Sequence, residues 1–193
     1  MTERKIKTQW GILALIVFLV TLSRLVPYAL GVEETFNFSP LAAVALFGGA
    51  YFMDKKKSFL FPLLALWISN LILDNVFLSQ YYDGFVLFQN WGVYLAIAAI
   101  VGLAFFVLKK VTLLRVVGAS LGASVLFFLV TNFVVWMQGT MYPMTFSGLG
   151  ECFTAAIPFF RNTLMGDMVF SLLLFGAFEW AVKRYPKQLL QQA

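Results

Sequence analysis

The sequence predicts an all-α integral membrane protein with six transmembrane helices. Of its 193 residues, 61% are hydrophobic and only 12% are charged, and the mean hydropathy is +0.86. A soluble domain is roughly half apolar and about a quarter charged, so this chain has too few polar residues to cover a water-soluble globule. Disordered chains are poor in aromatic residues, whereas 18% of these residues are aromatic. At about 20 residues per span, the chain has room for six spans and short loops, and we expect one transmembrane domain over residues 1–193.

The positions of the basic residues predict the topology. Hydrophobic stretches long enough for two crossings separate four basic clusters, and basic residues near span ends stay in the cytoplasm. We therefore expect both termini to be cytoplasmic and the protein to cross the bacterial cytoplasmic membrane several times. Because these charges are topological anchors, the net charge of +5 does not indicate a nucleic-acid partner. The clusters are Arg4, Lys5, Lys7; Lys55, Lys56, Lys57; Lys109, Lys110, Arg115; and Lys183, Arg184, Lys187.

The first two predicted spans follow from local signals. Trp10–Leu30 follows the basic N-terminus and lacks the small-residue cleavage site of a signal peptide. The second span starts near Pro40, since proline suits the first turn of a helix, and stops at Asp54. Its apolar part of about 14 residues would be about 21 Å long, which is less than a hydrocarbon core of roughly 30 Å. Either this helix begins earlier, near Phe36, or neighbouring helices cover one of its ends.

The remaining four spans are predicted at Ser58–Leu73, Trp91–Leu108, Arg115–Trp136 and Thr163–Val182. Ser58 is the predicted N-cap of the first of these. Between the last two lies Met137–Asn162, the longest stretch between spans. Most helix–helix connections are 2–8 residues long, and unusually long ones are often lids. We expect this stretch to be a non-helical gate over the outer mouth of the bundle, with a short helix at residues 149–157.

The composition excludes most enzyme chemistry. The chain has no His and one Cys, Cys152, which we place on the outer side. Serine and cysteine triads that need His, zinc clusters and an intrachain disulfide are therefore excluded. No pair of carboxylates has a fixed helical spacing that would suit acid–base catalysis. We expect no catalytic residues, no metal, no cofactor and no enzyme activity.

Polar residues inside the predicted spans gather in their outer halves, on four different helices. A charge at the bilayer centre costs about 2.5–3.5 kcal/mol on insertion scales, so such residues face a bundle interior, pair with one another or line a cavity. Arg24 with Asp167 or Asp74 is the candidate ion pair. This set is either a structural ion pair or, as we favour, a pocket open to the outside. The candidate solute-binding residues are Arg24, Asn70, Asp74, Asn132, Trp136, Tyr142, Arg161, Asn162 and Asp167.

Small residues recur four apart in several spans. The fifth span carries three overlapping pairs between Gly118 and Ser124, and the second carries Ala45 and Gly49. Small residues at this spacing let helix backbones approach closely where lipid gives no hydrophobic drive. They indicate packing within the chain or, alternatively, a face that docks a partner membrane protein.

Several runs of residues form one distinctive pattern: Asn37–Phe52, Phe61–Leu63, Ser69–Asn70, Asn132–Trp136, Met141–Pro143, Thr145, Gly148–Leu149 and Pro158–Thr163. This pattern resembles a small family of bacterial membrane proteins regarded as transport proteins. This resemblance extends over nearly the whole chain. That family is in turn similar to the substrate-binding S components of energy-coupling-factor vitamin transporters, through its size, its six spans and a short Gly-containing second helix.

The resemblance implies a substrate-binding membrane component that takes up a small, vitamin-like solute, with a coupling transmembrane subunit and its ATPases as partners. S components offer an Ala-x-x-x-Ala face on the first helix, where this chain has only Gly11 and Ala14. Another face would then dock the partner, or the protein works without it. The alternative function is a non-transporting accessory subunit of a larger membrane complex.

Overall fold

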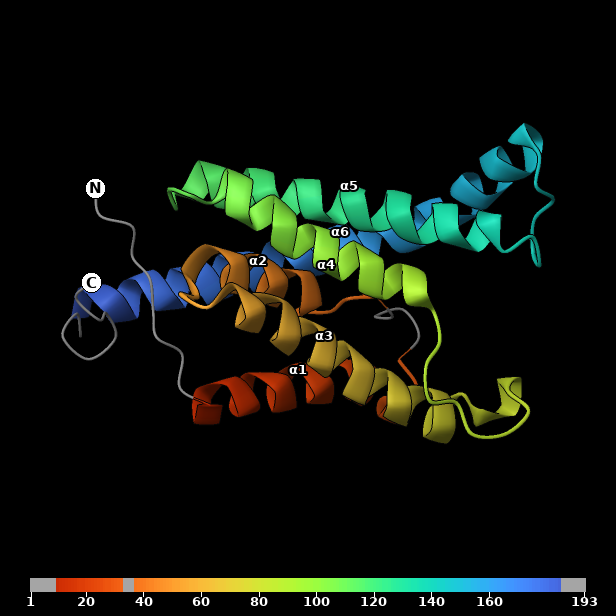
Figure 1. Ribbon diagram of the computed structural model, residues 1–193, viewed down its shortest axis with the longest axis horizontal. Coiled ribbons are helices and arrows are strands. Elements are labelled where there is room, and N and C mark those ends of the chain that lie inside the picture. Colours follow the sequence, from red (N-terminus) through yellow and green to blue (C-terminus); the bar gives the residue numbers. More distant parts are fainter. Residues whose placement is uncertain (1–9, 33–36, 185–193) are drawn as a thin grey trace.

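The computed structural model describes residues 10–32 and 37–184. In these residues it contains six α-helices and no strand, in agreement with the all-α class that the sequence predicts. Figure 1 shows α1 and α3 along one side of an elongated bundle and α5 along the other, with α2 and α4 between them. The helices are α1 (Trp10–Leu30), α2 (Leu41–Tyr51), α3 (Lys55–Ile72), α4 (Trp91–Val107), α5 (Leu113–Met137) and α6 (Phe146–Arg184).

The short helix α2 forms the centre of the bundle. It packs against α3, α4, α5 and α6, and all of its residues, Leu41–Tyr51, are buried. At 1.5 Å per residue its 11 residues are about 16 Å long. The structure therefore decides between the two alternatives that the sequence left open: α2 does not begin earlier, and its neighbours enclose it.

Helices α3, α5 and α6 are long and apolar enough to cross a membrane. With the turn that continues α3, these segments are Lys55–Phe77, Leu113–Met137 and Phe146–Arg184. The other apolar helices are shorter than 18 residues when only residues with described side chains are counted. They are Ala14–Leu30, Leu41–Tyr51 and Trp91–Val107. The protein is thus compatible with membrane insertion through three helices, while six complete spans stay a prediction.

The described basic clusters lie together at one end of the bundle, which we call the basic end. The α2–α3 and α4–α5 connections and the C-terminal end of α6 meet there, whereas the α3–α4 and α5–α6 connections lie at the opposite end (Figure 1). The residues concerned are Lys55, Lys56, Lys57, Lys109, Lys110, Arg115, Lys183 and Arg184. This arrangement is the one that the topology prediction requires; the N-terminal cluster and Lys187 lie outside the described residues.

Helix α3 begins before and ends after the predicted range Ser58–Leu73. Asp54, not Ser58, is its N-cap, because the Asp54 carboxylate accepts a 2.9 Å hydrogen bond from the backbone N–H of Lys56. The three lysines therefore belong to its first turn, and Ser58 is buried, where it donates to the Gly48 carbonyl. At the other end, a π-helical turn at Leu73–Phe77 continues the helix, so that Asp74 is helical rather than part of a loop.

The predicted non-helical gate at Met137–Asn162 is wrong. α6 begins at Phe146, and the α5–α6 connection is only residues 138–145. Two local interactions start the helix there: Thr145 Oγ1 accepts from the Gly148 N–H, as an N-cap does, and Gly148 packs directly on the Pro143 carbonyl. A Cβ on Gly148 would clash with that oxygen, so this glycine allows close packing.

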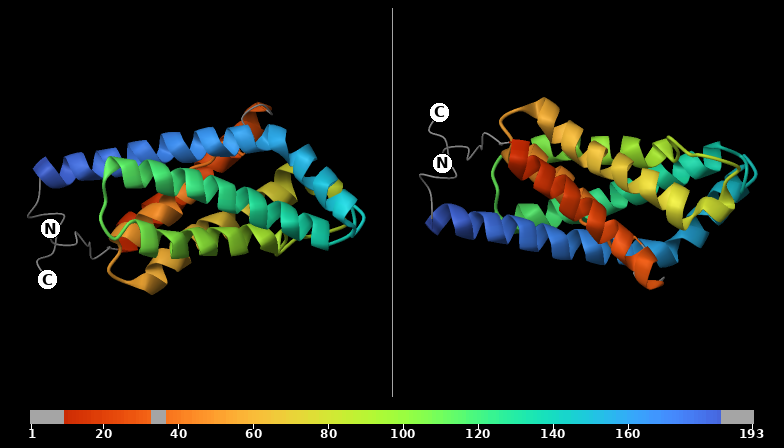
Figure 2. Two further views of the ribbon diagram at one scale, coloured as in Figure 1. Left: turned by 90° about the horizontal axis from the view of Figure 1, so that it is seen from above. Right: turned by 90° about the horizontal axis from the view of Figure 1, so that it is seen from below.

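Pro158 does not interrupt α6 either. The helix spans 39 residues, about 58 Å at 1.5 Å per residue, and it bends within its first half (Figure 2). Proline lacks the N–H that would bond four residues back and clashes with that carbonyl, so it kinks a helix when neighbouring contacts hold the two parts. The proline and glycines of this stretch predict a loop by composition, whereas the packed structure accommodates them in a bent helix.

The small residues of α2 and α5 pack inside the chain. Ala119, Ser120, Ala123 and Ser124 of α5 are buried, as is Ala45 of α2. The backbone of α2 approaches α4 so closely that a Cβ on Gly49 would lie 2.6 Å from the Cβ of Ala104. Intrachain packing, the first of the two readings of this pattern, is confirmed for these buried residues, whereas Gly118 of the same run is exposed and a Cβ on it would meet nothing within 4 Å.

Candidate functional site

A cavity with both apolar and polar walls lies beyond the N-terminal end of α2, toward the end of the bundle opposite the basic end. Because α2 begins only at Leu41, the helices around it extend past its first turn and enclose space there. The cavity has a volume of about 90 Å³. It is lined by Arg24, Pro27, Tyr28, Asn37, Phe38, Ser39, Leu41, Ala42, Leu73, Val93, Ile97, Phe127, Thr163 and Asp167.

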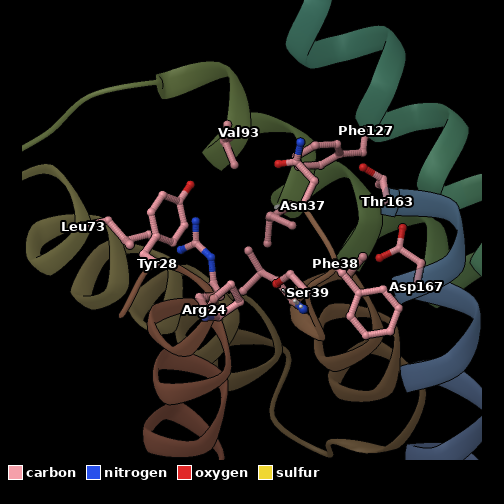
Figure 3. Close-up of a pocket in the computed structure, with 14 residues that line it drawn as sticks. Arg24, Tyr28, Asn37, Phe38, Ser39, Leu73, Val93, Phe127, Thr163 and Asp167 are labelled. Atoms are coloured by element: carbon pink, nitrogen blue, oxygen red, sulfur yellow. Dashed lines mark hydrogen bonds between the residues drawn. The ribbon is translucent and has the colours of Figure 1, made fainter. Parts of the chain in front are cut away.

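The two charged residues of this cavity come from opposite sides of it. Figure 3 shows Arg24 and Tyr28 of α1 on one side and Thr163 and Asp167 of α6 on the other, with Asn37 between them. Thr163 precedes Asp167 by four residues, so both lie on one face of α6. The cavity thus presents a cation and an anion that different helices hold apart.

Arg24 is anchored on α3 rather than on a carboxylate. Its guanidinium donates hydrogen bonds to Ser69 Oγ and, at 3.4 Å, to the Leu66 carbonyl. It is also close enough to Asp74 for electrostatic attraction to that carboxylate. The ion pair with Asp167 or Asp74 that the sequence predicts is therefore replaced by a hydrogen-bonded Arg24 with Asp74 as a nearby counter-charge.

Asp167 is anchored on α5. Its side chain is 3% exposed, and its Oδ2 accepts a 2.7 Å hydrogen bond from Ser124 Oγ. Gly166, the preceding residue, lets the Phe38–Ser39 backbone pass against α6, since a Cβ there would lie 3.0 Å from the Ser39 nitrogen. This contact brings the segment before α2 against Asp167 and closes that side of the cavity.

A second cavity adjoins the first. Its volume is about 260 Å³, and it shares Asn37, Val93, Phe127 and Thr163 with the first cavity. Its other lining residues are Phe128, Thr131, Asn132, Ala156, Phe159 and Phe160. The two cavities form one polar and aromatic region between α4, α5, α6 and the segment before α2.

The structure brings only part of the predicted site together. Arg24 and Asp167 line the first cavity and Asn132 the second, while Asp74 is buried beside Arg24. Asn70 lies beside Tyr94 and lines neither cavity.

The other predicted site residues lie apart from both cavities. Trp136 donates from Nε1 to the Pro143 carbonyl at 3.1 Å, which ties the end of α5 to the connection that follows it. Tyr142 lies in that connection. Arg161 is exposed on α6 and Asn162 is half-buried next to it, and neither lines a cavity.

Sequence reasoning missed the segment Asn37–Ser39, together with Tyr28 and Phe127. Asn37 has a left-handed backbone, with φ 69°, which few residue types adopt readily. An asparagine and a serine directly before Pro40 are a signal of such a turn. Thr163 could have been found from its spacing of four residues to Asp167.

The comparisons with known proteins give one result. A family model described as "Family of unknown function (DUF6580)" matches residues 4–189. No curated protein and no solved structure matches the chain.

Proposed function

We propose that this chain, which belongs to the family of unknown function DUF6580, binds a small solute as the substrate-binding component of a membrane uptake system. The observation that carries the proposal is the cavity with Arg24 and Asp167 on opposite sides, hydrogen-bonded to α3 and α5 but not to each other. Ionisable residues held apart around a cavity inside a membrane protein are typical of substrate or ion sites.

The lining of the cavity indicates the chemistry of the solute. Arg24 and the first turn of α2, which lines the cavity through Leu41 and Ala42, both favour an anionic or carbonyl group. A helix N-terminus carries a partial positive charge, and its first N–H groups lack partners within the helix. Tyr28 and Phe127 offer ring surface for a flat apolar part. We expect a small, vitamin-like or amino-acid-like compound with a carboxylate or amide group.

The proposed orientation follows from the charges at the ends of the bundle. With the basic end in the cytoplasm, both termini are cytoplasmic, the chain crosses the bacterial cytoplasmic membrane six times and the cavity opens outward. The resemblance to S components supports a coupling subunit with ATPases as the partner. On this proposal the protein delivers its solute to that partner and has no catalytic role.

The experiment uses the purified full-length protein in detergent micelles. Native mass spectrometry of the protein as isolated identifies any solute that copurifies. Isothermal calorimetry with a panel of carboxylate- and amide-bearing vitamins and amino acids then measures affinity for the wild type and for Arg24→Ala. We expect a loss of binding in Arg24→Ala and unchanged binding in Arg161→Ala, the matched control, since Arg161 is exposed and lines neither cavity.

Two results would count against the proposal. Equal affinity of Arg24→Ala and the wild type would show that the solute binds elsewhere. A protein that carries no small molecule as isolated and binds no member of the panel would favour the accessory-subunit function instead.

A further inference from the structure

Among the residues that the structure describes, no positive charge pairs with Asp167. Its one interaction partner in the part of the chain that the structure describes is the neutral hydroxyl of Ser124. Asp74, the other buried aspartate, has the attraction of Arg24. An unbalanced carboxylate at membrane depth costs several kcal/mol unless a cation or a proton accompanies it.

The Ser124 hydroxyl has two possible hydrogen-bond acceptors but only one proton to donate. Its Oγ lies 2.7 Å from Asp167 Oδ2 and 3.1 Å from the Ser120 carbonyl. A serine hydroxyl has one proton to donate and two lone pairs. When Ser124 donates that proton to the Ser120 carbonyl, no proton lies between the oxygens of Ser124 and Asp167. Their lone pairs then face each other, and this arrangement suits a bound cation.

Two further hydroxyls lie one helical turn away on the same helix faces. Ser120 is four residues before Ser124 on α5, and Ser171 is four residues after Asp167 on α6. Because α5 and α6 are antiparallel and packed together, these steps lead in the same direction along their interface, toward the basic end. Both side chains are 0% exposed, and their Oγ atoms have no hydrogen-bond partner within residues 10–32 and 37–184.

Such unpartnered hydroxyls need an explanation. Buried polar atoms in native proteins nearly always have a partner, and an exception often marks an ion or a water. Side chains in a helix tilt toward its N-terminus, so Ser171 leans toward Asp167 and Ser124 leans toward Ser120, while Ser120 itself leans further toward the basic end. Hydroxyl and carboxylate oxygens are the ligands of hard cations.

We propose that Asp167, Ser124, Ser120 and Ser171 bind one sodium ion between α5 and α6. One carboxylate neutralises one monovalent charge, whereas a divalent ion would leave a net positive charge buried. The site lies directly on the basic-end side of the solute cavity, with Asp167 shared between them. If a solute binds there, its binding is linked to that of Na⁺ through this carboxylate, but the cation site itself does not depend on the proposed solute.

The test measures Na⁺ binding without any solute. Thermal unfolding of the purified full-length protein in micelles, at mildly alkaline pH, is measured at a series of NaCl concentrations. Choline chloride makes up the rest of the salt, so that the ionic strength stays constant. A ligand that binds the native state raises the midpoint of unfolding in a saturable way. We expect such a rise with Na⁺ and none with choline. Asp167→Asn should abolish it, and Ser171→Ala and Ser120→Ala should each raise the half-saturating Na⁺ concentration at least tenfold.

Ser58→Ala is the matched control, since Ser58 is also 0% exposed but donates to the Gly48 carbonyl, on the other side of α2. It lowers the unfolding midpoint and leaves half-saturation by Na⁺ unchanged. Equilibrium dialysis of the wild type with radioactive sodium is the second measurement, and it needs no variant to fold. The proposal is overturned if the wild type retains no sodium, if choline stabilises as much as Na⁺, or if Ser171→Ala and Ser120→Ala both keep the wild-type half-saturation, as they would if Asp167 held only a proton.

Discussion

The hydroxyl of Tyr51, at the end of α2, donates a 2.6 Å hydrogen bond to the carboxylate of Glu179 on α6. The bond joins residues 128 positions apart, and the Tyr51 ring also packs on Phe175 and Phe178. Glu179 can be assigned from the sequence only to Lys183, one turn further along α6. The structure shows that it also fixes the central helix to the longest one.

Removal of the Tyr51 hydroxyl tests how much this hydrogen bond contributes to the free energy of unfolding. We expect Tyr51→Phe to lower the free energy of unfolding by about 1.5–3 kcal/mol, since the acceptor is an ionisable carboxyl group, with the ring packing kept. Chemical denaturation of the purified protein in mild detergent measures this change. Tyr81→Phe is the control, because Tyr81 is 71% exposed, and it should change stability by less than about 0.5 kcal/mol. Equal effects of the two variants would contradict the assignment.

The crossing of α2 and α4 predicts opposite effects for two glycines. Gly49→Ala places a Cβ 2.6 Å from that of Ala104, and overpacking of this kind costs typically 1–3 kcal/mol. A Cβ on Gly102, also in a helix, meets nothing within 4 Å. Gly102→Ala should be neutral or stabilising by up to about 1 kcal/mol. Thermal unfolding of the two variants compares them directly, and a Gly49→Ala protein as stable as the wild type would show that the crossing is looser than described.

Arg24 and Asp74 should be energetically coupled although Arg24 forms its hydrogen bonds with Ser69 and Leu66. In a double-mutant cycle with Arg24→Gln and Asp74→Asn, we expect a coupling of about 0.5–3 kcal/mol, because each single change leaves one buried charge without its counter-charge. The readout is the unfolding free energy of the wild type, both single variants and the double variant. A parallel cycle with Arg161→Gln should show no coupling, and additive effects in the first cycle would mean that Arg24 does not stabilise the Asp74 carboxylate.

The predicted topology can be tested by cysteine labelling in intact cells. Lys56, in the first turn of α3, and Tyr81, in the α3–α4 connection, are both exposed, and these two segments lie at opposite ends of the bundle (Figure 1). We expect a membrane-impermeant maleimide to label Tyr81→Cys from outside, and Lys56→Cys only after the membrane is permeabilised. The native Cys152 is 2% exposed and should give little background. Labelling of Lys56→Cys in intact cells would place the basic end outside and reverse the orientation of the cavity.

Composition and charge alone predict the membrane class of this protein and the positions of several helix ends. Hydropathy is a sum over residues, so the membrane class needs no knowledge of contacts, and the clusters of lysine and arginine mark the ends of helices wherever those helices pack. The helix Trp10–Leu30 was predicted with the bounds that it has. Arg24 and Asp167 were also recognisable from the sequence, because a charge within an apolar segment is costly wherever it lies.

Only the tertiary structure decided which of the polar residues meet. Glycine and proline predict a loop at Met137–Asn162 by their local preferences, but the packing of Gly148 on Pro143 and the bond from the Gly148 N–H to Thr145 start a helix at Phe146, and that helix continues through Pro158. The cavity exists because α2 is short and enclosed on all sides, and because Gly166 lets the backbone of Ser39 reach α6. These are contacts between segments far apart in the chain, and the periodicity of a single segment carries no information about its partners.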